Sequence, residues 1–252
     1  DFFRVLYMKT YDEMILGLKE LKEKGFVKTH RAGDTGIGKT LEDLLGIEEN
    51  NIPGPDGEDT ELKAARKNSP SMLTLFTKSP LPRGINSKLR QEYGYPDEKY
   101  PDKMILSSTV DSVNFNSIKK EKGFVVTSNK DRIELQHYRK PQKFPDMENA
   151  YWLKETVEKS IKKKYKKHLL YVKSDNRGTA ENEEFHYNEA YLLEGFDFEK
   201  FSKNLKAGIL KVDLRMDVDY KGKNIGKVHD HGTGFRIMPS LLDKIFSGKK
   251  VL

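Results

Sequence analysis

The sequence predicts a mixed α/β (α+β) protein, and three observations predict it. Apolar residues recur with helical spacing in segments such as 10–25 and 197–206, whereas they alternate with polar residues at 123–127 and 132–136. The chain has 252 residues, so it is long enough to bury a sizeable core. Its hydrophobic content of 36% excludes a chain that is disordered throughout.

The first helix is predicted to begin after Thr10, which forms a capping box with Glu13, and to end at Gly25. Further helices are assigned where apolar residues recur every three or four positions, strands where they alternate or run together, and loops where Pro, Gly and Asn gather. The remaining elements are predicted, in chain order, as a helix at 40–47, neighbouring strands at 60–64 and 72–77, an irregular segment at 80–101, strands at 123–127 and 132–136, a helix at 148–167, a strand at 169–172, a loop or hairpin at 174–188, a helix at 197–206, and strands at 208–216 and 234–238.

The composition restricts the class of protein. The chain carries 46 Lys and Arg residues against 39 Asp and Glu residues, and the resulting net charge of +7 favours anionic partners, with nucleic acid first. The absence of Cys excludes disulfides, thiolate zinc sites and cysteine nucleophiles, so a metal must use carboxylate, imidazole or carbonyl ligands. No apolar run could span a membrane and residues 1–10 do not resemble a signal peptide, so we expect a cytoplasmic protein without a membrane partner.

Residues 33–40 match the phosphate-binding P-loop pattern G-x-x-x-x-G-K-[ST]. A P-loop needs a buried strand before its glycines, but Lys28, His30 and Arg31 make the preceding segment polar. Besides a P-loop NTPase, two interpretations stay open. The glycines lead into the predicted 40–47 helix, capped by Thr35 or Thr40, or the loop and Lys39 bind a DNA phosphate.

A second pattern, D-x4-E-x-K, is formed by Asp56, Glu61 and Lys63. In a strand, residues two apart point to the same face, so Glu61 and Lys63 project together while Leu62 packs on the other side. Asp56, in the preceding turn, can then complete a carboxylate pair for a hard divalent cation such as Mg²⁺. This combination suits metal-assisted hydrolysis of a phosphodiester, although a solvated strand face also often reads Glu-x-Lys.

Taken together, several motifs in order resemble the MvaI/BcnI restriction endonuclease family. They are Gly36-Ile37-Gly38-Lys39-Thr40-Leu41-Glu42, Pro55-Asp56, Glu61-Leu62-Lys63, the segment from Leu73 to Pro80, and His229-Asp230-His231-Gly232-Thr233-Gly234-Phe235-Arg236. The resemblance implies a PD-(D/E)xK restriction-endonuclease-like core related to the mismatch-repair nickase MutH, with a mixed sheet flanked by helices and two lobes around a DNA cleft. It also implies that residues 33–40 bind no nucleotide cofactor.

By the same resemblance, Asp56 and Glu61 are metal ligands, Lys63 orients the attacking water, and Glu42 is an additional acid of the active site. The implied cofactor is Mg²⁺, with Mn²⁺ as a possible substitute and Ca²⁺ expected to bind without supporting cleavage. We expect residues 1–85 to form the main part of a catalytic lobe. Residues 86–252 are then expected to form a DNA-recognition lobe that contributes some elements back to the catalytic lobe.

The segment His229-Asp230-His231 allows three interpretations: a zinc site, a polar turn, or direct contact with bases. We favour base contact because Arg pairs with the O6 and N7 atoms of guanine, while Asp accepts from N4 of cytosine. Arg215 with Asp213, and Arg236 with Asp230, are the two predicted sets of reading residues.

The predicted function is a type II restriction endonuclease that cuts double-stranded DNA at a G·C-rich site of about five base pairs. The resembling enzymes read sites of the form CCNGG, either CC-W-GG or CC-S-GG. We expect a monomer of prokaryotic origin that cuts the two strands in turn, with Lys78 and Arg83 on DNA phosphates. A MutH-like nickase is the nearest alternative, and a P-loop NTPase is the more distant one.

Overall fold

The computed structural model describes residues 8–48, 54–118, 122–139, 147–220 and 222–252. By its internal contacts the chain divides into two compact units. The first unit comprises residues 1–71, 161–197 and 245–252, and the second unit comprises residues 72–160 and 198–244.

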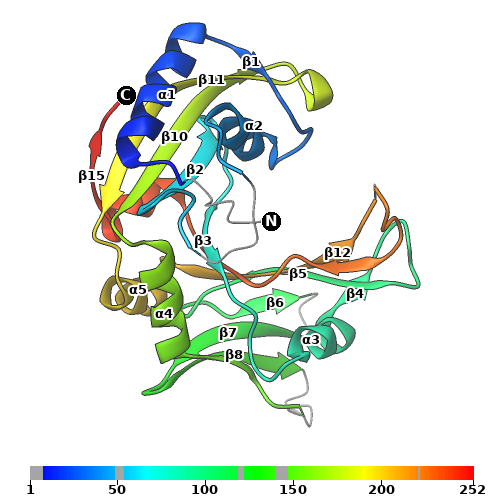
Figure 1. Ribbon diagram of the computed structural model, residues 1–252. Helices are drawn as coiled ribbons and strands as arrows, with labels where there is room; N and C mark the ends of the chain where they lie inside the picture. The colour runs from blue at the N-terminus through cyan, green and yellow to red at the C-terminus, as the bar shows by residue number, and fades with distance from the viewer. Residues whose placement is uncertain (1–7, 49–53, 119–121, 140–146, 221) are drawn as a thin grey trace, which may run out of the picture. The chain divides into compact units, whose positions relative to one another are not determined.

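The first unit is built on a mixed five-stranded sheet, ordered β1-β11-β10-β2 with β15 also paired to β11 (Figure 1). Strand β10 runs parallel to β2 and antiparallel to β11. The strands are β1 (Val27–Lys28), β2 (Thr60–Arg66), β10 (His168–Arg177), β11 (Glu184–Glu194) and β15 (Ser247–Lys250), and a short 3-10 helix η1 (Ala180–Asn182) lies between β10 and β11.

Two helices cover this sheet, α1 (Tyr11–Lys24) and α2 (Gly36–Leu44), and both contribute to the same buried core (Figure 1). The predicted capping box is confirmed, because the Glu13 backbone N–H donates to Thr10 Oγ1 and the Thr10 N–H donates to Glu13. The core joins residues that are distant in sequence, including Leu18, Leu41 and Leu170. Strand β2, which carries the acidic motif, therefore pairs with the long strand β10 and packs against helix α2.

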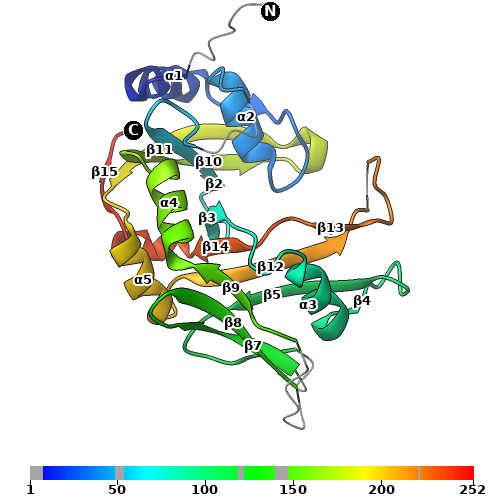
Figure 2. The ribbon, with the colours of Figure 1, turned by 60° about the horizontal axis from the view of Figure 1, so that its bottom comes forward.

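The second unit contains two antiparallel sheets. One is ordered β3-β14-β12-β5-β4 with β13 also paired to β12, and the other is ordered β6-β7-β8-β9. Figure 2 shows helix α3 beside β5. The elements are β3 (Leu73–Thr77), α3 (Ile85–Tyr93), β4 (Tyr95–Pro96), β5 (Met104–Val110), β6 (Asn116–Ile118), β7 (Lys122–Ser128), β8 (Arg132–Arg139), β9 (Ala150–Leu153), α5 (Phe198–Lys206), β12 (Lys211–Val218), β13 (Val228–Asp230), β14 (Gly234–Ile237) and the 3-10 helix η2 (Pro239–Lys244).

The two units do not follow a single boundary at residue 85. Strand β3 pairs with β14, which places residues 72–85 in the second unit, and β10 and β11 pair with the strands of the first unit. Helix α4 (Lys154–Lys164) begins in the second unit and ends in the first. The first unit thus also contains two later segments of the chain, residues 161–197 and 245–252.

Several elements differ from the sequence expectation. Helix α2 begins at Gly36, four residues before the predicted start, and Thr35 makes no side-chain cap hydrogen bond. Strand β3 does not lie beside β2 in one sheet, because it pairs with β14. The segment 80–101 is not irregular, since α3 buries residues at helical spacing between Gly84 and Gly94. The predicted helix at 148–167 is shorter, because residues 150–153 form β9.

Candidate functional site

The two carboxylates of the acidic motif meet at the start of β2. Glu61 lies in the strand with a side chain that is 0% exposed. Asp56 precedes the strand, and its Oδ2 accepts a hydrogen bond of 2.8 Å from the backbone N–H of Leu62. The turn between them is closed by a hydrogen bond from Gly57 N–H to Thr60 O, and Gly57 has no room for a side chain because a Cβ there would lie 2.5 Å from Lys9 O.

Glu61 is a buried carboxylate with its two oxygens in different surroundings. Oε1 lies 2.6 Å from Lys63 Nζ and 2.8 Å from Lys164 Nζ, whereas Oε2 forms no ion pair with a described residue. Both oxygens are buried, and neither accepts a hydrogen bond of regular geometry from the described residues. Burial raises the pKa of Glu61, and the two ammonium groups oppose that effect. A buried, unpaired carboxylate oxygen beside a second carboxylate is a position that favours a cation.

Lys63 lies on the same face of β2 as Glu61, as the alternation of the strand predicts, while Leu62 packs into the core. Burial disfavours the charged form of Lys63, but the carboxylates of Glu61, Asp56 and Glu42 outweigh it and raise the pKa of this ammonium above its usual value. Lys63 is therefore protonated at neutral pH. In that form it can hold a water molecule or an anionic oxygen.

Helix α2 brings Glu42 to this cluster, as the influence of its charge on Lys63 indicates. The helix is fixed by two contacts of its own residues: Tyr187 O–H donates to Ile37 O at 2.7 Å, and Thr40 Oγ1 accepts from His30 N–H at 2.8 Å. Glu42, Asp56, Glu61 and Lys63 all belong to the first unit. The structure thus brings together the four residues that the sequence predicts for catalysis.

Arg66, at the end of β2, fixes the loop that precedes α2. Its guanidinium makes a bidentate ion pair with Glu183, with both N···O distances at 2.6 Å, and it also donates to Gly33 O at 3.2 Å. The glycine loop is consequently tied to β2 and, through Glu183, to the beginning of β11.

The surroundings of residues 33–40 are not those of a P-loop. The strand before them, β1, has two residues and pairs antiparallel at the sheet edge, instead of forming a buried parallel strand. Thr40 lies inside α2 with no exposed surface, and its hydroxyl accepts from the His30 N–H. Lys39 forms an ion pair of 2.8 Å with Asp43. Residues 33–40 therefore lack the buried parallel strand that a P-loop requires, and the structure does not support the P-loop alternative.

In the second unit, strands β12 and β14 bring the two candidate reading arginines together. Arg236 donates from Nη1 to Asp213 Oδ2 at 2.7 Å and from Nη2 to Met72 O at 2.6 Å. Arg215 donates from Nη2 to the carbonyl oxygens of His231 and Gly232 at 3.1 and 3.2 Å. Each guanidinium is held in place by groups of the protein and keeps further N–H donors.

The two aspartates of the predicted reading sets lie in different surroundings. Asp213 pairs with Arg236, whereas its distance to Arg215 Nε is 3.9 Å. Asp213 is only 6% exposed and also accepts from Thr109 Oγ1, so in this structure it positions Arg236. Asp230, which was predicted to read bases together with Arg236, is exposed and accepts from Asn86 Nδ2 at 2.9 Å.

The two histidine rings of the His229-Asp230-His231 segment lie side by side, with centroids 4.2 Å apart and ring planes tilted by 31°. Both are exposed, and each lies beside an aspartate, His229 beside Asp219 at 3.4 Å and His231 beside Asp217 at 2.7 Å. Among the described residues, no group of three or more His, Asp or Glu side chains is arranged to hold a metal ion. The zinc interpretation of this segment therefore has no support from the described part of the chain.

A comparison of the sequence with known protein families shows which family the chain belongs to. The model of the MvaI/BcnI restriction endonuclease family matches residues 15–246. The chain belongs to the MvaI/BcnI restriction endonuclease family. It is accordingly a type II site-specific endonuclease with a PD-(D/E)xK-type fold, as the resemblance implied.

Two solved structures resemble this member of the family. A complex of the restriction endonuclease MvaI with its cognate DNA substrate is 32% identical, with a TM-score of 0.89 over 97% of this chain and 100% of that chain. The restriction endonuclease MvaI in the absence of DNA is 31% identical, with the same coverage and a TM-score of 0.57. No curated protein matches the chain in the comparison made.

No helix within the described ranges has the length and apolar character needed to cross a membrane. The candidate phosphate contacts of this endonuclease lie in both units, with Lys39 in the first and Lys78 and Arg83 in the second. Lys78 follows β3, where its backbone carbonyl accepts from Trp152 Nε1, and Arg83 is exposed just before α3.

Sequence reasoning missed two residues beside the candidate sites. Asn86, on α3, is buried and donates to Asp230 and Thr233, so it orients the exposed aspartate. Lys164, at the end of α4, contacts Glu61, although it belongs to a lysine run that is typical of a solvated helix face. Helical spacing separates Lys164 from Lys162 and Lys163, because it lies three positions after the buried Ile161 and seven after the buried Val157. Its partner Glu61, however, depends on the path of the chain.

Proposed function

We propose that this endonuclease hydrolyses phosphodiester bonds of double-stranded DNA with Mg²⁺, at a short G·C-rich site of the form CCNGG, either CC-W-GG or CC-S-GG. The observation that carries the proposal is the junction of Asp56, Glu61 and Lys63, with Glu61 Oε2 buried and unpaired. The similar MvaI has been solved with its cognate DNA substrate, which supports DNA as the partner here.

The donor set fits a hard divalent cation. Mg²⁺ is typically held by one or two carboxylates and keeps several waters, so a pair of carboxylates suffices without a third protein ligand. Asp56 and Glu61 would hold the ion, and the hydrogen bond from Leu62 N–H fixes one oxygen of Asp56. When bound, such an ion supplies positive charge that offsets the charge developing on the phosphodiester. Mn²⁺ is expected to substitute, and Ca²⁺ to bind without cleavage.

The residues of the chain perform the remaining tasks. Lys63, as an ammonium group, orients the attacking water and stabilises negative charge on the phosphate oxygens. Glu42 adds a third carboxylate that helps keep Lys63 charged and positioned. Hydrolysis in this arrangement leaves a 5′-phosphate and a 3′-hydroxyl.

Arg215 and Arg236 are the proposed readers of guanine. A bidentate contact requires a guanidinium that is fixed in orientation, and both side chains are fixed by hydrogen bonds to the protein. Asp230, held by Asn86, and the two neighbouring histidines are exposed for contacts with the complementary bases. Lys39, Lys78 and Arg83 are the proposed phosphate contacts, and the enzyme is proposed to act as a monomer.

Digestion of a sequenced plasmid tests the function directly. With Mg²⁺, the purified protein is expected to convert the supercoiled plasmid first to nicked and then to linear fragments, with ends that map to CCNGG sites. A plasmid with those sites removed should remain intact under the same conditions. Accumulation of nicked circles without double-strand breaks would support the MutH-like alternative, and an uncut plasmid at every salt concentration would refute the proposal.

Replacing Arg236 with lysine is expected to weaken discrimination at one G·C pair by about 10- to 100-fold, because lysine cannot make the bidentate contact. The measurement is kcat/KM on the cognate duplex and on duplexes with that pair changed to A·T. Arg83→Lys is the matched control and should leave the ratio of these values unchanged, because a phosphate contact does not discriminate bases. An unchanged ratio in Arg236→Lys would exclude Arg236 as a reader.

A further inference from the structure

Two lysines, not one, contact the buried carboxylate of Glu61. Lys63 Nζ lies 2.6 Å and Lys164 Nζ lies 2.8 Å from the same oxygen, Oε1. Lys164 is the last residue of α4 and lies far from Glu61 in the sequence. Its side chain is 27% exposed. Because Glu61 itself is 0% exposed, this contact is not an ordinary surface ion pair.

The turn that follows Lys164 is tied to the segment between the two carboxylates. Lys166 Nζ donates to Glu58 O at 3.1 Å, and Lys167 Nζ pairs with Asp59 Oδ2 at 2.7 Å. The backbone N–H groups of Lys167 and His168 both donate to Asp59 O at 3.2 Å. These backbone and side-chain contacts hold the end of α4 beside the start of β2, within reach of the Lys164 side chain.

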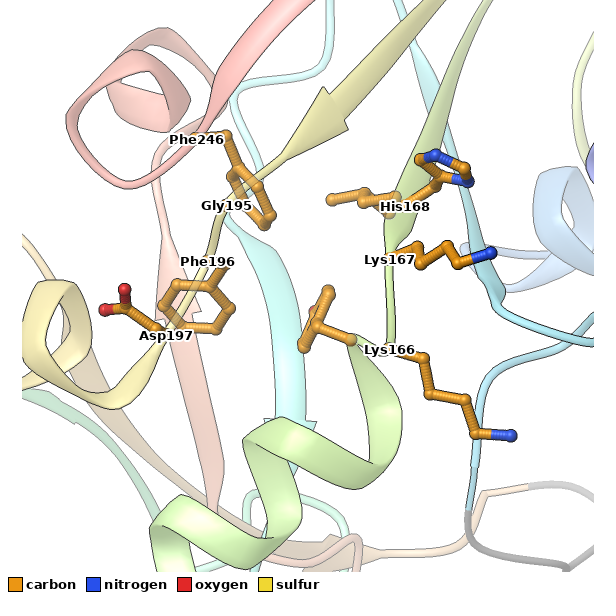
Figure 3. A pocket seen from close by; sticks show the side chains of 9 residues that line it. Lys166, Lys167, His168, Gly195, Phe196, Asp197 and Phe246 are labelled. Atoms are coloured by element: carbon orange, nitrogen blue, oxygen red, sulfur yellow. The ribbon is translucent and has the colours of Figure 1, made fainter.

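Aromatic packing holds the other side of this turn. Tyr165 is buried and lies against Phe196 and Phe246, with ring centroids 5.1 and 5.9 Å away. Figure 3 shows Phe196 and Phe246 on one side of the adjoining pocket, while Lys166 and Lys167 extend away from it. The aromatic residues anchor the end of α4, and Lys166 and Lys167 contact the segment between Asp56 and Glu61.

We propose that Lys164 is a second active-site lysine, which acts as the counter-ion of Glu61 in the metal-free enzyme and competes with the divalent cation for that carboxylate. This inference rests on the proposed metal site. Glu42, Asp56 and Glu61 place three carboxylates near two ammonium groups, Lys63 and Lys164. Without Lys164 the cluster has one more uncompensated negative charge, which must strengthen attraction for a cation.

The role differs from that of Lys63. Lys63 shares its strand with Glu61 and remains beside the carboxylates wherever a cation binds, because two residues of one strand face keep their spacing. Lys164 approaches from another element and can withdraw its ammonium group when a cation takes the carboxylate. It is therefore a positioning and charge-balancing residue that acts through Glu61.

The test is direct titration of the DNA-free protein with Mn²⁺, with free Mn²⁺ followed by electron paramagnetic resonance. Lys164→Gln and Lys164→Met are both expected to bind Mn²⁺ at least about fivefold more tightly than the wild type, the usual size of coupling between two sites. Lys164→Arg should restore the wild-type affinity. Circular dichroism melting of each variant verifies that the fold is retained.

Lys163→Gln is the matched control, because it removes the same charge from the neighbouring, exposed position of α4. It should leave the Mn²⁺ affinity within about twofold of the wild type, as water screens an exposed charge. Equal affinities of Lys164→Gln, Lys163→Gln and the wild type would overturn the inference about Lys164.

Glu61→Gln separates this inference from the proposed metal site. It should abolish the bound Mn²⁺ if Glu61 is a ligand. If the wild type binds Mn²⁺ and Glu61→Gln does not, but the Lys164 variants behave as the wild type, the metal site stands and the inference alone fails. If Glu61→Gln binds Mn²⁺ as the wild type does, or if the wild type binds none, both fail.

Discussion

Replacing Lys63 with alanine is expected to reduce DNA cleavage on the order of 10³-fold or more, while binding of cognate DNA in Ca²⁺ persists. The physical reason is the position of its ammonium group, 2.6 Å from Glu61 and on the same strand face as this proposed metal ligand. Its raised pKa keeps it charged at neutral pH, so its loss removes both the group that orients the water and a positive charge beside the phosphate.

The measurement is single-turnover cleavage of a cognate duplex, with binding followed by fluorescence anisotropy in Ca²⁺. Lys67→Ala is a suitable control, because Lys67 follows the same strand and pairs with Asp175, away from the two carboxylates. The control should cleave within about threefold of the wild type. A Lys63→Ala enzyme that cleaves within tenfold of the wild type would contradict the role assigned to Lys63.

Replacing Phe235 with alanine is expected to destabilise the second unit by about 3–5 kcal/mol, the usual cost of truncating a buried aromatic residue. Phe235 is 0% exposed. Its ring lies 4.8 Å from Phe76 and 5.4 Å from both Trp152 and Phe201, measured between centroids. It precedes Arg236 in β14, so loosening of this cluster should also weaken recognition of DNA.

Urea unfolding monitored by the fluorescence of Trp152, the single tryptophan of the chain, reports on this cluster. Phe115→Ala provides the same change of side chain at a position that is 49% exposed. It should cost about 1 kcal/mol or less, because about half of the Phe115 side chain is already exposed to water. Equal losses of stability in the two variants would show that the Phe235 cluster does not determine the stability of the second unit.

Local patterns predicted much of the fold. The capping box of α1, the antiparallel strands β7 and β8, and the amphipathic helix α5 were predicted because each depends on residues within a few positions of one another. The errors had two causes, local helix breakers and distant strand partners. Helix α3 was hidden by the Pro and Gly residues around it, and β3 was assigned beside β2 although it pairs with β14, more than a hundred residues away.

The candidate sites likewise combine features set by neighbouring residues with features set by distant parts of the chain. Two-residue alternation in a strand placed Glu61 and Lys63 on one face, and the structure agrees. The pairing of Arg236 with Asp213 could not be predicted, because it depends on the register of β14 against β12. A shift in that register would have selected a different carboxylate.

The sequence by itself determined the family, the strand that carries Asp56, Glu61 and Lys63, and the residues available to contact bases. These properties lie in short segments whose geometry is local. Only the tertiary structure decided that Lys164 contacts Glu61 and that Asp213 holds Arg236. The physical reason is that such charge pairs form where the folded backbone brings separate elements within a few ångströms, and no spacing in the sequence encodes that distance.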